Sequence, residues 1–185
     1  MELENLEGKI IGVITNENQV EDFSNKKVNE IILFKVDDSL KMVGLPIDLK
    51  NKIYDDLSSR DKSKVLLASK LNNKCIILRD FSKGLIKKDI EIFKILFKKI
   101  ASYDKKIILI DHNLELFINC VDKIYNIEND EIVYSTNNIF DKKLYSHIDM
   151  PQIVKFIFKC KEFGINLDEY NELDELIKAI YRIKS

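Results

Sequence analysis

The chain has 185 residues, of which 45% are hydrophobic and 33% charged, and its 30 basic and 31 acidic side chains give a net charge of -1. This length supports one domain with a sizeable core. The balanced charge provides no global field that would favour nucleic acid or an anionic membrane. No apolar run approaches the roughly 20 residues that span a bilayer, so any membrane contact is expected to be peripheral.

The first third of the chain predicts two strands separated by a polar loop. Lys9–Ile14 is short, apolar and rich in β-branched residues, which is typical of a buried strand. The residues from Thr15 to Asn29 are polar and predict a loop, with or without a short helix. Glu30–Val36 (EIILFKV) is the second candidate strand, and Gly44-Leu45-Pro46 interrupts the polar connection after it.

The middle of the chain alternates helix and strand signals. Apolar residues at i, i+3, i+4 and i+7 indicate an amphipathic helix whose apolar face is formed by Phe93, Leu96, Phe97 and Ile100. The elements expected around this helix are, in chain order, a helix over Lys62–Leu71, a strand over Lys74–Leu78 with a turn around Gly84, a strand over Lys106–Ile110 and a helix over Leu114–Cys120.

The last third predicts a β-hairpin and a helical tail. Lys123–Ile127 and Glu131–Ser135 are joined by Glu128-Asn129-Asp130, which is typical of a hairpin. The first tail helix is expected to begin at Pro151 and end at Gly164, with a face formed by Ile153, Phe156, Ile157 and Cys160. Asn171 is expected to cap a last helix that carries Leu173, Leu176, Ile177 and Ile180. Alternating strands and helices with apolar strands predict a parallel α/β core.

The three cysteines lie far apart and lack a metal-binding spacing. Cys75 and Cys160 fall inside apolar patterns, which favours buried free thiols. The odd number of cysteines and the lack of a leader-like segment indicate a reducing compartment. We therefore expect a cytoplasmic protein without a metal site.

The segment from Asp56 to Glu115, which contains DLSSRDKSKVLLASK, CIILRDFSKGL and IILIDHNLE, resembles the second half of an ABC-type ATPase. Together with the hairpin and the tail, it is similar to the ATP-binding subunits of energy-coupling-factor (ECF) transporters, over Leu6 to Ile183. The resemblance implies a P-loop-NTPase-like α/β core over residues 1–135 that lacks most of the family's β and helical subdomains. It also implies a helical tail over residues 136–185, packed on the core or at a dimer face.

The segment GKIIGVITNENQVEDF resembles the family's strand and phosphate loop, but its chemistry is altered. Thr15 and Val20 fall where the loop glycines belong, Glu21 where the lysine belongs, and Asp22 where the Mg²⁺-binding hydroxyl belongs. Two like charges about 4 Å apart cost on the order of 4 kcal/mol at an effective dielectric near 20. Carboxylates facing phosphates in this way disfavour ATP binding.

The family's signature motif corresponds to Leu57, Ser58, Ser59 and Arg60. Leu57 and Ser58 match the family pattern, whereas Ser59 and Arg60 replace its two glycines. The resemblance implies a surface that closes over a nucleotide held by a partner subunit. An alternative interpretation is a solvated helix start with Ser58 or Ser59 as its N-cap.

Asp80 and His112 occupy the positions of the family's catalytic groups. Asp80 stands at the general-base glutamate and His112 at the histidine that senses the γ-phosphate. Arg79 replaces the Mg²⁺-binding aspartate, and Ile86 replaces the aspartate that closes the turn. Asp80 could instead pair with Arg79 or cap the turn. His147 has no motif around it and is expected at the surface.

Three functions remain as hypotheses. The first is a degenerate, non-catalytic ECF-type subunit that pairs with an intact ATP-binding subunit or with itself, and reaches the membrane only through the transporter complex. It requires no cofactor and no nucleic acid. The second is an active ATPase that uses ATP, Mg²⁺, Asp80, His112 and a lysine such as Lys26 or Lys27. The third is a freestanding α/β protein with an unrelated role.

Overall fold

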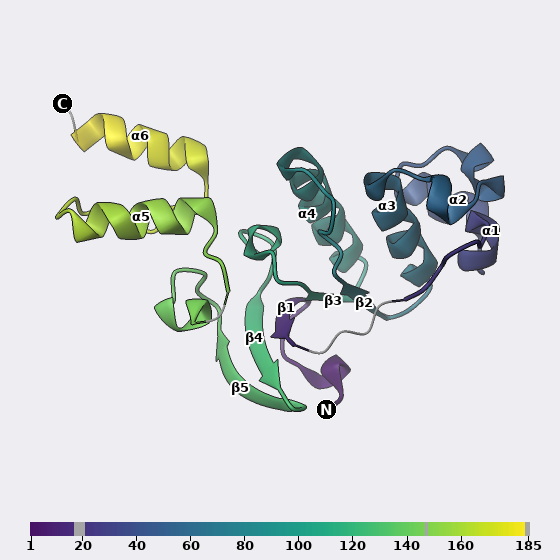
Figure 1. Cartoon of the computed structure of the whole chain (residues 1–185), viewed down its shortest axis with the longest axis horizontal. Helices are drawn as coiled ribbons and strands as arrows, with labels where there is room; N and C mark the ends of the chain where they lie inside the picture. Colours follow the sequence, from purple (N-terminus) through teal and green to yellow (C-terminus); the bar gives the residue numbers. More distant parts are fainter. Residues whose placement is uncertain (17–20, 147, 184–185) are drawn as a thin grey trace.

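The computed structural model describes residues 1–16, 21–146 and 148–183, and its centre is a five-stranded mixed sheet. The strands are β1 (Ile10–Thr15), β2 (Cys75–Arg79), β3 (Lys106–Ile110), β4 (Lys123–Glu128) and β5 (Glu131–Thr136). Their order is β2-β3-β1-β4-β5 (Figure 1). All neighbours are parallel except β4 and β5, which form the predicted hairpin. The predicted α/β fold class is confirmed.

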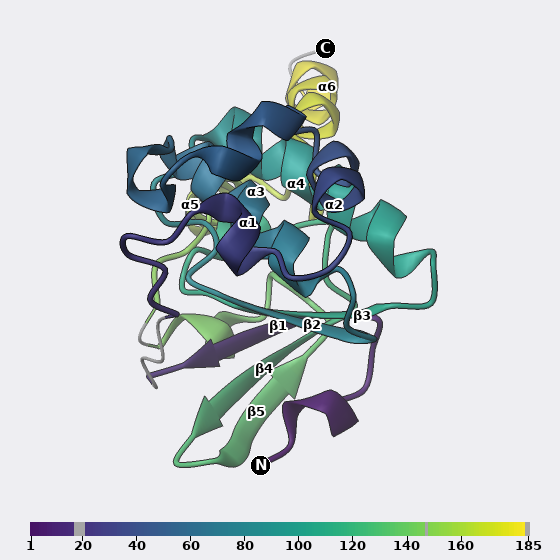
Figure 2. The ribbon, with the colours of Figure 1, turned by 90° about the vertical axis from the view of Figure 1, so that its right-hand side faces the viewer.

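The helices lie mainly on one face of this sheet (Figure 2). The α-helices are α1 (Val28–Ile31), α2 (Val36–Met42), α3 (Ser59–Lys70), α4 (Lys87–Ala101), α5 (Gln152–Glu162) and α6 (Leu173–Ile183). The 3-10 helices are η1 (Leu3–Asn5), η2 (Ile47–Asn51), η3 (Tyr54–Asp56), η4 (Leu114–Leu116) and η5 (Lys142–Tyr145). On the opposite face, Leu3 and Leu6 of the N-terminal segment pack against β1, β3 and β4.

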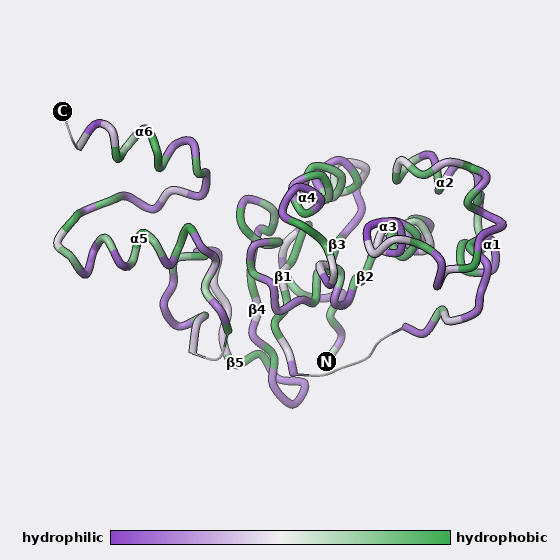
Figure 3. Tube along the Cα trace, turned by 45° about the horizontal axis from the view of Figure 1, so that its top comes forward, coloured by the Kyte–Doolittle hydropathy of each residue, from purple (hydrophilic) through white to green (hydrophobic). Residues whose placement is uncertain are grey.

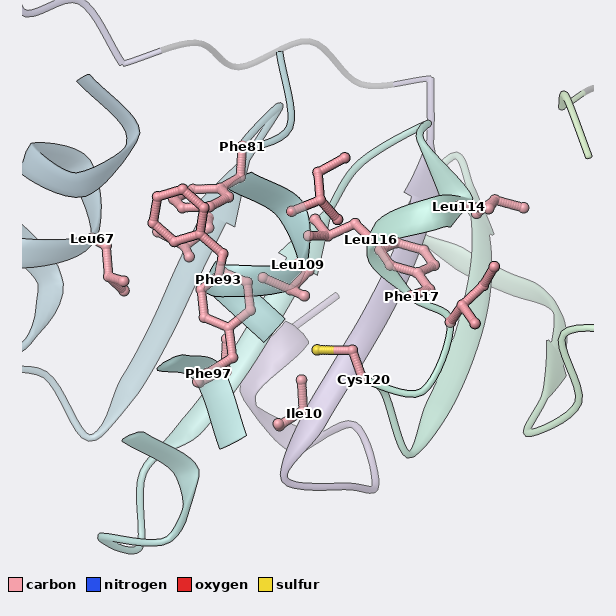
Figure 4. Packing of buried hydrophobic residues seen from close by; sticks show 14 of the residues in the cluster. Ile10, Leu67, Phe81, Phe93, Phe97, Leu109, Leu114, Leu116, Phe117 and Cys120 are labelled. Carbon is pink, nitrogen blue, oxygen red and sulfur yellow. The ribbon is translucent and has the colours of Figure 1, made fainter. Parts of the chain in front are cut away.

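The core is anchored by three phenylalanine rings between α4 and the end of β2. Phe81 contacts Phe93 and Phe97 edge-on, with ring centroids 4.6 and 5.2 Å apart (Figure 4). All three side chains are almost fully buried. Rings in this arrangement contribute beyond the apolar area they bury, so the turn after β2 is held by the core as well as by its backbone.

The two tail helices lie at one end of the molecule, and α1 to α3 lie at the other (Figure 1). Hydrophilic and hydrophobic stretches alternate along α5 (Figure 3), as expected for an amphipathic helix. Its buried residues are Val154, Ile157 and Phe158, whereas the predicted face member Phe156 is exposed. Gly164 follows the C-cap of α5 with a positive φ of 77°, and the helix ends there as predicted.

The predicted strand over Glu30–Val36 is wrong. This segment contains the end of α1, an irregular stretch and the start of α2. The buried residues Val28, Ile31 and Ile32 follow the helical spacing i, i+3, i+4, while Leu33 and Phe34 are exposed. Lys35 adopts a left-handed φ of 43°, which stops extended pairing. β2 therefore remains an edge strand of the described sheet.

The bounds of three other elements also differ slightly from the sequence predictions. Leu114–Cys120 holds only the short η4 followed by turns, with Asn119 at a φ of 54°. Pro151 is the N-cap of α5 and not its first residue. Because α6 begins at Leu173, Asn171 lies one position before the cap.

The cysteines are free, as predicted, but their burial differs from the prediction. Cys75 and Cys160 are half-buried, and Cys120 is the buried thiol. Burial raises the pKa of Cys120 to about 11. None of the helices among the described residues combines the length and apolar content needed to cross a membrane.

The neighbouring residues Ile32 and Leu33 test the corrected segment. Ile32 is 1% exposed and Leu33 is 85% exposed. We expect Ile32→Ala to lower the free energy of unfolding by about 2–5 kcal/mol, and Leu33→Ala to change it by less than about 0.5 kcal/mol. Urea unfolding of both variants measures the difference. Similar losses at both positions would contradict the exposed turn and favour a buried strand.

Candidate functional site

The sequence-predicted site residues lie where the parallel strands β1, β2 and β3 end. In α/β proteins, ligands bind outside the carboxyl ends of such strands. β1 ends at Thr15, β2 at Arg79 and β3 at Ile110, and β3 lies between the other two. Each of the three strands leads into a different local structure, and these structures determine which ligands this edge can bind.

The chain that continues from β1 leaves the sheet. Residues 21–27 pass toward α1, which is only four residues long (Figure 1). Glu21 pairs with Lys70 on α3, with 2.7 Å between Oε1 and Nζ. Asp22 accepts hydrogen bonds from the backbone N–H and the hydroxyl of Ser24, which lower the pKa of this exposed carboxyl. Val20 lies outside the described residues.

A phosphate loop requires a helix N-terminus directly after the strand, where backbone N–H groups and the helix dipole hold the anion. In the described residues between β1 and α3, the longest helix is α2, with seven residues. Lys26 lies over the ring of Phe23. Lys27 occupies the N-cap position of α1, where its backbone N–H donates to the Glu30 carboxylate. The described part of the chain therefore does not provide the helix start that would hold phosphates beside β1.

The signature positions form the start of α3. Ser58 is the N-cap: its hydroxyl oxygen accepts the Asp61 N–H at 3.1 Å and its O–H donates to the Asp61 carboxylate at 2.8 Å. This confirms the capping interpretation for Ser58, whereas Ser59 is the first helical residue. Arg60 pairs with Asp89 at the start of α4, with 2.9 Å between Nε and Oδ1. Leu57 packs half-buried against the core.

Asp80 forms the turn after β2 through its backbone. Its N–H donates to the Ile110 carbonyl at 2.9 Å, and its carbonyl accepts the Lys83 N–H at 3.1 Å. Its φ is 47°, a left-handed value that aspartate tolerates better than most residues. No ion pair joins Arg79 and Asp80 in the part of the chain that the structure describes. The backbone, not the carboxylate, makes the turn.

Asp111 was not singled out from the sequence, yet it holds this edge of the sheet together. Its buried carboxylate accepts the N–H and the hydroxyl of Ser82, both at 2.8 Å, and the Asn113 N–H at 2.9 Å. Asp111 thus joins the end of β3 to the turn after β2. An aspartate after a buried strand and next to His112 was the available signal in the sequence.

His112 and Asp80 line different cavities. The cavity of His112 measures about 430 Å³ and also contacts Glu115, Asp149 and Gln152. Asp80 lines a cavity of about 440 Å³ that also contacts Glu21, Ser59 and Arg79. The structure therefore does not bring the two predicted catalytic groups to one cavity. His147 lies outside the described residues.

No group of three or more His, Cys, Asp or Glu residues within the described ranges could hold a metal ion. Arg79 places a cation where the resemblance implies a Mg²⁺-binding carboxylate. A cation at this position disfavours Mg²⁺, which prefers carboxylate and phosphate oxygens.

Removal of the Asp111 carboxylate tests its structural role. Asp111→Ala would leave three donors without an acceptor, and we expect it to lower the free energy of unfolding by about 3 kcal/mol or more. Asp111→Asn keeps one acceptor oxygen and should cost less. Asp130→Asn, which weakens an exposed pair with the N-terminus and keeps a residue that tolerates the left-handed φ of 63°, is the control and should cost less than about 1 kcal/mol. Equal effects of Asp111→Ala and Asp130→Asn in urea unfolding would contradict the structural role of Asp111.

Gly84 and Gly164 provide a matched pair, because both have a φ of +77°. A Cβ on Gly84 would lie 2.8 Å from the Ser59 Oγ, whereas one on Gly164 would meet nothing within 4 Å. We expect Gly84→Ala to cost about 1 kcal/mol more than Gly164→Ala. In a Ser59→Gly background the difference should shrink. If the difference in stability between the two glycine variants were unchanged in this background, Ser59 would not be the group that a side chain at Gly84 contacts.

Comparisons with known proteins identify the relatives of this chain. No family model matches the chain. The Energy-coupling factor transporter ATP-binding protein EcfA2 of Spiroplasma kunkelii is 32% identical over 155 residues, which cover 78% of this chain and 51% of the relative. The EcfA2 protein of Mycoplasma capricolum is 27% identical over 144 residues, 72% of this chain and 49% of the relative. The chain thus spans about half the length of these curated relatives.

Solved structures support the fold. A nucleotide-free ATP-binding cassette from an ABC transporter aligns with a TM-score of 0.56 and 15% identity, over 73% of this chain and 67% of that one. The cbiO1 protein of Clostridium perfringens aligns with a TM-score of 0.52 and 20% identity, over 83% of this chain and 65% of that one. The chain belongs to the family of ATP-binding subunits of ECF transporters, within the ABC ATPases.

Proposed function

We propose that this chain is a non-catalytic relative of the ECF ATP-binding subunits that pairs with an intact ATP-binding subunit. The observation that carries the proposal is the path of the chain after β1. Residues 21–27 lead away from the sheet to a four-residue helix, and Glu21 pairs with Lys70. Neither a phosphate cradle nor its lysine stands at the end of β1 in the described residues.

The replaced residues near β2 support the same proposal. A catalytic base must stand within hydrogen-bond reach of the water it activates, and Asp80 is one methylene shorter than the glutamate that the family uses. His112 lines a separate cavity. Arg79 places a positive charge where a Mg²⁺ ligand would be needed. Each change by itself weakens hydrolysis, and together they favour a role in binding a partner.

The tail provides the surface that we propose for pairing. Phe163 is 83% exposed and Tyr181 is 70% exposed, and Leu173 on α6 is also largely exposed. Large exposed apolar side chains on the tail helices are candidate contacts of a protein interface. The relatives are named as transporter ATP-binding proteins, and cbiO1 is described as part of the ABC transporter complex cbiONQ. We propose that this chain reaches the membrane only through such a complex.

An affinity purification from the native cell, with and without nucleotide, tests the pairing. We expect mass spectrometry to identify an ECF-type ATP-binding subunit bound to the full chain. Phe163→Asp should reduce its recovery by about tenfold or more, because a buried unpaired charge weakens an interface. Leu33→Asp is the matched control, since Leu33 is 85% exposed at the opposite end of the molecule, and should leave recovery unchanged.

Two outcomes would contradict the proposal. If the chain is recovered as a monomer without an ATP-binding subunit, a freestanding role is favoured. If the purified chain releases phosphate from Mg-ATP and Asp80→Asn abolishes the release, the chain is an active ATPase despite its altered motifs.

A further inference from the structure

A cavity lies between α4 and the first turns of the tail helices α5 and α6 (Figure 1). Its volume is about 390 Å³, and neither Asp80 nor His112 lines it. The buried Ile118 and the half-buried Ile153 contribute apolar surface to it. The cavity is thus distinct from the strand ends where the family's chemistry would be expected.

One wall of this cavity is a single face of α4. Its lining residues follow the spacing i, i+4, i+7, i+8 and i+11, and they are Lys87, Glu91, Lys94, Ile95 and Lys98. Lys94 is buried and pairs with Glu91, with 2.8 Å between Nζ and Oε1. At about 1.5 Å per residue this face is roughly 16 Å long, or about three helical turns. The wall is therefore long enough to lie beside another helix.

Exposed apolar side chains stand on both walls. Ile95 is 71% exposed and Leu173 is 54% exposed, and both line the cavity. In α6, Leu176 and Ala179 are buried, whereas Leu173 and Ile177, four residues apart, are a second apolar pair that packing leaves exposed. A single exposed apolar residue is ordinary, but apolar side chains on both walls of one cavity favour a surface that a partner covers.

The two walls carry opposite charges. Lys87 and Lys98 of α4 line one side, and Glu172 and Asp174 at the start of α6 line the other. Within the described ranges, none of these four side chains takes part in an ion pair. Glu115 adds a third carboxylate beside the tail, where it accepts the first backbone N–H of α5. A ligand that carries both signs of charge would complement both walls.

We propose that the groove between α4 and α6 binds an amphipathic helix of a partner protein. The apolar stripe of that helix lies against Ile95 and Leu173, as is usual for helices that dock in grooves. Its acidic flank faces the lysines of α4, and its basic flank faces the carboxylates of α6. This inference goes beyond the proposed pairing. Leu173 belongs to both surfaces, whereas Phe163, whose substitution tests the pairing, does not line the groove.

Fluorescence anisotropy of labelled synthetic peptides, titrated with the purified full chain, tests the groove. The probes are three peptides of about 18 residues, long enough to form helix in water, and all three share one leucine stripe. The mixed peptide carries Glu on one flank and Lys on the other, the second carries only Glu, and the third only Lys. We expect the mixed peptide to bind at least about tenfold tighter than the other two.

Substitutions on α4 assign the binding to the groove. Lys98→Glu makes both walls acidic, so it should weaken binding of the mixed peptide by about tenfold and strengthen binding of the all-Lys peptide. Lys99→Glu is the matched control, because Lys99 is the next residue of α4, is exposed and does not line the cavity. It should leave all three affinities unchanged. Ile95→Ser removes the apolar contact and should weaken the mixed peptide by about tenfold.

The proposal would be overturned if the three peptides bind alike, or if Lys98→Glu and Lys99→Glu have the same effect. Sedimentation equilibrium of the chain alone gives a further outcome. A dimer that Lys98→Glu dissociates would assign the groove to a second copy of the chain and would also overturn the proposal. Ile95, Lys98 and Lys99 are all exposed, so these variants are expected to fold, and circular dichroism checks this.

Discussion

The buried carboxylate of Asp111 is the interaction on which this edge of the molecule depends. It accepts hydrogen bonds from Ser82 and Asn113 and so joins the end of β3 to the turn after β2. Buried carboxylates are costly unless hydrogen-bonded, and leaving their donors without an acceptor costs more than the bonds themselves contribute. The hydrogen bonds of Asp111 to Ser82 and Asn113 are therefore strongly favoured once the strands have paired.

Asp111 holds the turn after β2, and this turn positions the elements around it. Phe81 enters the core between Phe93 and Phe97, and its carbonyl accepts the Ser63 hydroxyl of α3. Gly84 lies so close to Ser59 that a side chain would not fit without movement. The start of α3, the turn and the end of β3 thus form one rigid unit.

Among the residues that the structure describes after β1, no comparable organisation is found. Glu21 and Asp22 make contacts of their own with Lys70 and Ser24, and the chain continues to short helices at the far side of β2 (Figure 1). In ABC ATPases, hydrolysis needs both halves of the edge, because the phosphates are held on one side and the water is activated on the other. We propose that retention of only one half leaves the family fold without its chemistry.

The sequence predicted the strands well, because short apolar β-branched runs such as Lys106–Ile110 have few alternatives in a buried sheet. It failed at Glu30–Val36, where a contiguous apolar run concealed a helical spacing that starts two residues earlier, at Val28. In α5, Val154 and Phe158 are buried by tertiary packing, whereas the predicted face member Phe156 is exposed. The candidate site residues were predicted from their positions in the family's motifs. Motif positions could reveal neither the hydrogen bonds of Asp111 nor the cavities lined by Asp80 and His112, because these depend on burial and on contacts between distant segments.

The measurement that tests the account most directly is a titration of the purified chain with Mg-ATP. The account predicts no saturable binding up to about 1 mM, which corresponds to about 4 kcal/mol. Tight, Mg²⁺-dependent binding would contradict it.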